Sequence, residues 1–152
     1  MEKFFEAIRS GNAEKVKLML TLGQNVNVKD EYGITPLHMA MWKVAEITAM
    51  LISAGADVNA VDNNGNSVLH RAVVSGSIHE EDGGNVEITS MLISAGANVN
   101  AVDNKGNSVL HRAVYDGIAK KWKVEIINML ISAGANVNAR NRGGKTALEL
   151  MS

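Results

Sequence analysis

Histidine is the side chain in this chain best suited to metal binding or acid–base chemistry, and three of the four copies recur in one pattern. His38, His70 and His111 each lie three residues after a threonine or serine. Packed helices lie about 8 to 10 Å apart, so imidazoles on neighbouring copies of a helix are too far apart to share one zinc ion. The spacing therefore predicts no metal site at these three histidines.

The fourth histidine belongs to an acidic run, His-Glu-Glu-Asp, at residues 79–82. Two interpretations stay open for this run: weak cation binding, or a solvated charged loop, which is the commoner use of such sequences. The paired carboxylates Glu80 and Glu81 lack the buried setting that a general acid requires.

Serine and cysteine give no better route to catalysis. Ser67 and Ser108 stand where a helix cap is expected, which assigns them to capping rather than to nucleophilic attack. The absence of cysteine removes thiol nucleophiles and thiolate metal ligands. The sequence predicts a protein that is not an enzyme and needs no cofactor.

An internal repeat organises the whole chain. Residues 91–114 repeat residues 50–73 with two changes in 24 positions, Asp57 against Asn98 and Asn64 against Lys105. Weaker copies begin at Leu18 and Met129. A pattern that recurs in this way indicates a solenoid, in which each unit packs only on its neighbours.

Each unit reads as a tight turn followed by two helices. Gly33 can adopt positive φ in the turn, and Thr35 can cap the helix that begins at Pro36. We expect this first helix to end at about Lys43, and a second helix to cover residues 45–54. Residues that recur with helical spacing are predicted to form the core: Leu37, Ala40, Leu51, Ile52, Leu69, Ala72, Leu92, Ile93, Leu110, Ala113, Leu130 and Ile131.

The motifs Gly-Ile-Thr-Pro-Leu-His-Met-Ala at 33–40 and Leu-Ile-Ser-Ala-Gly-Ala-Asp-Val-Asn-Ala at 51–60 resemble the ankyrin repeat. In that family a β-turn finger precedes two antiparallel helices. The resemblance covers essentially the whole chain and implies an all-α ankyrin-repeat solenoid of helix-turn-helix units. It also implies that each repeated histidine bonds its capping hydroxyl and the backbone of the adjoining finger.

The resemblance divides the chain, residues 1–152, into one domain of five units. An N-terminal cap (1–29) with helices at 4–10 and 14–22 precedes full repeats at 30–61, 62–102 and 103–140, and a C-terminal half repeat at 141–152. The repeats begin 32, 41 and 38 residues apart, and the variation falls between the two helices. This variation in spacing predicts an acidic insert at residues 76–85 and a basic insert at residues 115–123. The two inserts either pair with each other or form an exposed recognition edge.

The resemblance implies a protein partner held on the concave face, which fingers and first helices form. Aromatic and arginine side chains are the usual anchors of such interfaces. For Trp42, packing within its own repeat is an equal alternative to partner binding. The predicted partner-binding residues lie on this face, with one in the second insert: Tyr32, Ile34, Trp42, Asn66, Arg71, Val74, Lys105, Arg112, Tyr115 and Trp122.

An asparagine closes each unit, at positions 27, 59, 100 and 138. We expect its side chain to satisfy backbone groups of the tight loop that leads into the next finger. The resemblance adds that Asn59 can be hydroxylated by a host enzyme, because Leu51 lies eight residues before it.

Net charge and hydropathy give no indication of nucleic acid or membrane as a partner. Fifteen basic residues against sixteen acidic ones create no field that recruits nucleic acid or anionic lipid. No apolar run approaches the roughly 20 residues that span a bilayer. We expect a cytoplasmic or otherwise intracellular protein, and an effector delivered into a host cell fits the same pattern. We expect it to bind a protein partner, and to bind neither nucleic acid nor membrane.

The last apolar residues leave a second function open. Leu148, Leu150 and Met151 cannot all be covered by so short a terminal unit. A monomer is the expected state, and the alternative is a structural or self-assembling scaffold that forms a dimer through its C-terminal end.

Overall fold

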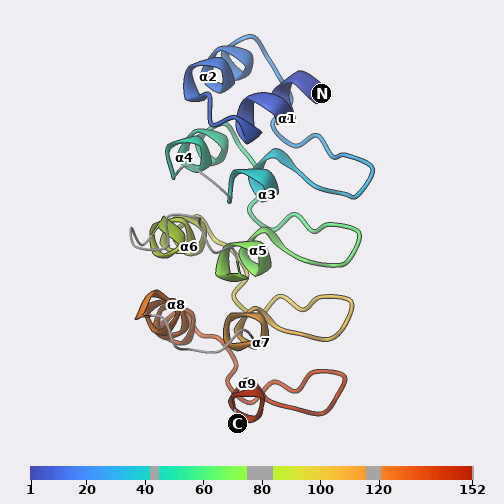
Figure 1. Cartoon of the computed structure of the whole chain (residues 1–152), viewed down its shortest axis with the longest axis vertical. Helices are drawn as coiled ribbons and strands as arrows, with labels where there is room; N and C mark the ends of the chain where they lie inside the picture. The colour runs from blue at the N-terminus through green and yellow to red at the C-terminus, as the bar shows by residue number, and fades with distance from the viewer. Residues whose placement is uncertain (42–44, 75–83, 116–120, 152) are drawn as a thin grey trace.

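The computed structural model describes residues 1–41, 45–74, 84–115 and 121–151. Within these residues the helices form two columns, and the loops that precede the first helices form a third (Figure 1). The helices of the described part are α1 (Glu2–Arg9), α2 (Ala13–Thr21), α3 (Pro36–Ala40), α4 (Ala45–Ser53), α5 (Val68–Val74), α6 (Gly84–Ser94), α7 (Val109–Val114), α8 (Lys121–Ser132) and α9 (Ala147–Leu150).

Each helix packs on the equivalent helix of the next unit. In the first column α1, α3, α5, α7 and α9 follow one another, and in the second column α2, α4, α6 and α8 do the same. The described residues contain no extended strand, only the single bridges Val61–Ser67 and Val102–Ser108 at the bases of two fingers. The predicted all-α solenoid of helix-turn-helix units is confirmed.

Reciprocal caps start the first helices. The Thr35 hydroxyl accepts a hydrogen bond from the His38 amide, and the Thr35 amide donates to His38 Nδ1, both at 3.3 Å. Ser108 and His111 make the same capping box. These bonds satisfy amides that have no partner inside the helix. The predicted capping roles of Thr35 and Ser108 are confirmed.

The fingers are tied together internally and to one another. In the first finger, Asp30 Oδ1 accepts from the amides of Tyr32 and Ile34, at 2.9 Å each. Gly33 has φ of 74°, in the left-handed region that glycine adopts without a steric penalty. The Asn63 amide of the second finger donates to the Tyr32 carbonyl at 3.0 Å. The finger row is therefore a hydrogen-bonded edge and not a set of separate loops.

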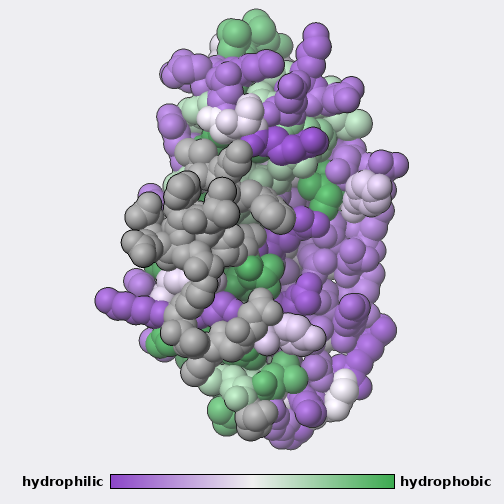
Figure 2. Space-filling view, in the orientation of Figure 1, coloured by the Kyte–Doolittle hydropathy of each residue, from purple (hydrophilic) through white to green (hydrophobic). Residues whose placement is uncertain are grey.

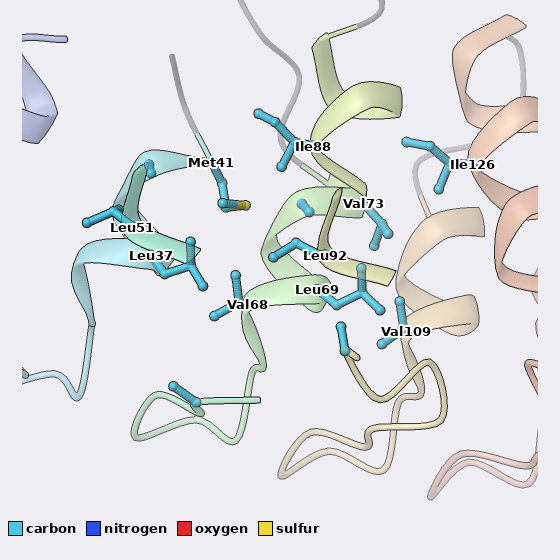
Figure 3. Close-up of a cluster of buried hydrophobic side chains, with 14 of the residues drawn as sticks. Leu37, Met41, Leu51, Val68, Leu69, Val73, Ile88, Leu92, Val109 and Ile126 are labelled. Carbon is cyan, nitrogen blue, oxygen red and sulfur yellow. The ribbon is translucent and has the colours of Figure 1, made fainter. Parts of the chain in front are cut away.

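Leucine and branched aliphatic side chains form one continuous core between the two columns (Figure 3). The predicted leucines of the core are confirmed as buried: Leu37, Leu51, Leu69, Leu92, Leu110 and Leu130. Val68 and Val109, which take the place of Pro36 after the cap, are fully buried but were absent from the predicted core.

An isoleucine follows each core leucine of the second helices, and of these three only Ile131 was assigned to the core wrongly. Ile52 and Ile93 are half-buried, and Ile131 is 45% exposed. Ile52 and Ile93 pack against the core, and Ile93 lies where α8 packs on α6. No second helix packs beyond α8 in the described part of the chain.

The unit-closing asparagines act between repeats, which corrects their predicted role. Asn59 Nδ2 donates to the Gly96 carbonyl at 3.2 Å, and Asn59 Oδ1 accepts from the Asn98 amide at 2.7 Å. Both partners lie in the loop that leads from α6 into the third finger, one repeat further along, and not in the loop of Asn59 itself. Equivalent pairs of bonds join Asn27 to Gly55 and Asp57, and Asn100 to Gly134 and Asn136.

The predicted inserts lie largely outside the described residues. Residues 42–44, 75–83 and 116–120 are among those not described, so Trp42 and the acidic run at 79–82 lie outside the structural account. In the second predicted insert, α8 already begins at Lys121. Lys121, Trp122 and Lys123 therefore belong to a helix and not to a loop.

Candidate interaction face

We call the finger face the surface formed by the four fingers (residues 30–34, 62–66, 103–107 and 141–145) with α1, α3, α5 and α7. In the view of Figure 2, hydrophilic side chains gather along the edge where the fingers lie. The finger edge is thus strongly polar, whereas the helices behind it contribute aliphatic groups to the core.

A hollow of about 620 Å³ lies at the N-terminal half of the finger face. Ile8 and Ile34 are buried and Met39 is half-buried, so the floor of the hollow is apolar. Arg9 Nε donates to Met39 Sδ at 3.5 Å across it. Side chains from α1, the first finger, α3 and α5 line it: Glu6, Ile8, Arg9, Ser10, Ile34, Met39 and Arg71.

Sequence reasoning missed the part of this hollow that the N-terminal cap contributes. Helix α1 packs on α3 as α3 packs on α5, so α1 continues the column of first helices. Aligning the Ala-Ile of residues 7–8 with the Ala-Met of residues 40–41 places Glu6 at the position of Met39. That alignment is the sequence signal that extends the binding face into the cap.

Arg71 links its helix to the finger beside it. Arg71 Nη2 lies 3.0 Å from Asp62 Oδ2, and the Asp62 side chain is 1% exposed. Burial acts to raise the pKa of Asp62, but hydrogen bonds from Arg71 and from the amides of Asn66 and Asn64 outweigh it and hold the pKa below its usual value. Asp62 therefore stays ionised, and much of the Arg71 charge is neutralised. Arg112 repeats this arrangement more loosely, with Nε 3.7 Å from Asp103 Oδ2.

Five of the predicted partner-binding residues keep part of the side chain exposed to solvent. Tyr32 is 64% exposed, Tyr115 is 70% exposed and Lys105 is exposed. Arg71 and Arg112 are half-buried and reach the surface beside their aspartates. Tyr32, Lys105, Arg71 and Arg112 belong to the fingers, α5 and α7 and so to the finger face, whereas Tyr115 is the C-cap of α7. The binding role of all five stays a prediction.

Ile34, Asn66 and Val74 are less available than the sequence pattern indicated. Ile34 is only 8% exposed, although it lines the hollow. Asn66 is half-buried, and its Nδ2 donates to Asp62 Oδ2 at 3.3 Å. Val74 is half-buried and packs against the core. The position of a residue in the repeat motif does not show how far its side chain is buried.

Trp122 lies in the second column, away from the finger face. It is half-buried against the core, and Lys123 Nζ lies 5.7 Å from the centre of its ring. This placement separates Trp122 from the other predicted anchors, and it makes local packing one role of the side chain.

The repeated histidines join neighbouring units, as predicted. Nε2 of His38, His70 and His111 lies 3.1, 3.0 and 2.8 Å from the carbonyl oxygens of Asn66, Asn107 and Lys145. A carbonyl only accepts, so Nε2 carries the proton and Nδ1 is free to accept from the capping residue.

Burial lowers the pKa of His38 and His70, against the opposing effect of their bonds to carbonyl groups. The neutral ring is therefore the folded form of these two side chains. In the described part of the chain, no group of three or more histidine, aspartate or glutamate side chains is placed to hold a metal ion.

The described C-terminal unit leaves apolar surface uncovered. Leu148 is 73% exposed and Met151 is 42% exposed, while Leu150 is half-buried. The expectation that these three side chains are not all covered is confirmed. Whether a second copy covers them stays a prediction.

Family models match nearly all of the chain. A model described as ankyrin repeats in three copies matches residues 4–82, and a single ankyrin repeat matches residues 64–104 and 105–142. A search of curated proteins gives no match. None of the helices described above is long and apolar enough to cross a membrane.

Proposed function

The chain belongs to the ankyrin-repeat family, and from that premise we propose that it is a protein-binding module that holds its partner on the finger face. Ankyrin repeats are in general protein–protein interaction modules. The proposal specifies that this chain binds through its finger face. It also specifies that the chain acts by binding a partner and not by catalysing a reaction.

The hollow lined by Ile34, Met39 and Arg71 is the observation that carries this proposal. It joins an apolar floor to a rim that bears Glu6 and Arg9, both exposed. Interfaces draw most of their binding energy from a few apolar or aromatic anchors set inside a polar rim. Because the fingers are already hydrogen-bonded to one another, little conformational entropy is lost when a partner binds.

The side chains best suited to catalysis form hydrogen bonds and ion pairs that hold the fold together. His38, His70 and His111 bridge the caps of their own helices to the next finger. Asp62 and Asp103 hold finger amides and face arginines. A binding role uses the finger face without taking any of these groups from the scaffold.

Comparative affinity capture tests the proposal. Wild-type protein, Tyr32→Ala, Arg9→Glu and the control Leu22→Ala are immobilised, and captured proteins are quantified by isotope labelling. Leu22 is 77% exposed at the end of α2 in the second column, so its loss leaves the finger face intact. We expect the same captured proteins to be lost with Tyr32→Ala and Arg9→Glu and kept with Leu22→Ala. Equal capture by all four would contradict the proposal and turn attention to Trp122.

The exposed Leu148 supports a second candidate function, self-association through the C-terminal unit. A scaffold of this kind would form dimers that Leu148→Asp dissolves, because the substitution places a charge on the apolar contact. Light scattering that shows a wild-type monomer at high concentration would count against it.

A further inference from the structure

The exposed charge of the finger tips changes sign along the stack. Glu31 gives the first tip a negative charge, and the second tip carries only asparagines. The aspartates that begin the second and third fingers are buried, 5% and 7% exposed, and face arginines, so they contribute little to the surface. The third and fourth fingers present cations: Lys105, Arg142 and Lys145.

These three cations are not used by the scaffold. Lys105, Arg142 and Lys145 are all exposed, and their side chains make no ion pair within the described residues. Arg140 differs, because its Nη1 lies 3.2 Å from Glu149 Oε2. The three charges remain available to an outside partner.

The hollow and the cationic tips lie at opposite halves of the same face. The hollow is lined by α1, α3, α5 and the first finger, whereas the cations belong to the third and fourth fingers. With about 8 to 10 Å between stacked units, the first and fourth fingers lie about 27 Å apart. An extended chain covers that distance in about eight residues, at about 3.3 Å per residue.

We infer that the partner presents an extended acidic segment, with one apolar side chain in the hollow and aspartate or glutamate residues over Lys105, Arg142 and Lys145. This inference rests on the proposed function, because the segment occupies the same finger face. The polarity of the face also fixes the direction in which the segment lies, with its acidic part toward the C-terminal fingers.

The same charges favour a protein segment over a nucleic acid. A phosphate backbone laid along the finger row would meet Glu31 at its other end, while Glu6 offsets the charge of Arg9 on the rim of the hollow. Glu31 would repel the phosphates, and the net charge of −1 gives no compensating field. A peptide can place its anionic residues at one end of the face and its apolar anchor at the other.

Peptide display supplies the probe for the test. A library of random peptides is selected on the immobilised wild-type chain, and one selected peptide is labelled for fluorescence anisotropy. Its binding is measured to wild type, to Lys105→Glu with Arg142→Glu, and to the matched reversal Lys15→Glu with Lys17→Glu. Lys15 and Lys17 are exposed on α2, so the control changes the net charge equally without touching the finger face.

We expect selected peptides with an apolar residue toward one end and an excess of aspartate and glutamate toward the other. Reversal at the fingers should weaken binding about tenfold or more, and the loss should grow at low salt, because exposed ion pairs are screened by salt. The control reversal should change binding less than about twofold, the long-range effect of net charge alone.

Any one of five results would overturn the inference. Recovery of no binding peptide is one. Two outcomes would refute the role of the charges and leave the proposed function standing. In one, the selected peptides have no excess of acidic residues; in the other, Tyr32→Ala weakens binding but the finger reversal does not. A single-stranded oligonucleotide that displaces the peptide with equal affinity would point to nucleic acid instead. Peptides insensitive to both Tyr32→Ala and Arg9→Glu would refute the proposed function itself.

Discussion

Replacing Asn59 with alanine should loosen the contact between the second helices of neighbouring repeats. The substitution removes the donor to the Gly96 carbonyl, at 3.2 Å, and the acceptor of the Asn98 amide, at 2.7 Å. It leaves the bond from the Asn59 amide to Asp57 Oδ1 in place, because that donor belongs to the backbone. The change is therefore confined to the two bonds between repeats.

The magnitude follows from the number and exposure of these bonds. One intramolecular hydrogen bond contributes about 0.5 to 1.5 kcal/mol net, so two contribute about 1 to 3 kcal/mol. Asn59 and Asn98 are exposed, so water reaches the groups that lose their partners. That access favours the lower half of the range, and we expect the free energy of unfolding to fall by about 1 to 2 kcal/mol.

Asn138→Ala is the matched control. Asn138 closes the last full repeat, and its amide donates to Asn136 Oδ1 at 3.0 Å as Asn59 does to Asp57. Its side chain makes no hydrogen bond within the described residues. We expect its substitution to change the free energy of unfolding by less than about 0.5 kcal/mol.

Urea unfolding followed by circular dichroism measures both losses, and hydrogen exchange locates them. In Asn59→Ala the Asn98 amide loses its acceptor and should exchange faster, whereas the Asn136 amide should keep its rate. Equal losses in the two variants, or unchanged exchange at Asn98, would refute the assignment of these asparagines as links between repeats.

Three further predictions concern pH, backbone geometry and modification. Burial lowers the pKa of His38 and His70 below 6.5, so their contribution to stability is complete above that pH and is lost on acidification. The urea concentration at the unfolding midpoint should therefore fall as the pH is lowered below 6.5, and a midpoint that does not change with pH would contradict this. Gly65→Ala should destabilise more than Gly144→Ala by about 1 kcal/mol or more in the same assay, because both have positive φ but only at Gly65 would a Cβ lie 2.9 Å from a backbone nitrogen of the next finger. Incubation with an asparaginyl hydroxylase should add one oxygen to the peptide that contains Asn59, and a mass spectrum without that gain would dispose of the predicted modification.

The local structure of each unit could be predicted from the sequence because it depends on residues close in the chain. Thr35 and His38 form a cap within one turn, and Gly33 and Asp30 close one finger. Such contacts follow from residue type and spacing alone. Leu92 is buried for a similar reason, since a recurring leucine at helical spacing needs only a neighbouring helix to cover it.

The contacts between repeats were harder to predict, because the sequence does not show which of several nearby groups a side chain reaches. Asn59 has backbone groups within its own loop, yet it bonds to the equivalent loop of the next repeat, after α6. Ile131 has the same sequence surroundings as Ile93, but the structure covers the two differently. The hollow was missed because Glu6 belongs to a cap whose sequence departs from the repeat motif.

Site-specific photo-crosslinking tests the central claim, that the finger face holds the partner, most directly. A photoreactive amino acid is placed at Tyr32, at Tyr115, or at Leu22 and Ile131 in the second column, all of which are exposed. The account predicts covalent adducts with the same protein from Tyr32 and Tyr115 and none from Leu22 or Ile131. Adducts confined to Leu22 and Ile131, or equal adducts from all four positions, would contradict it.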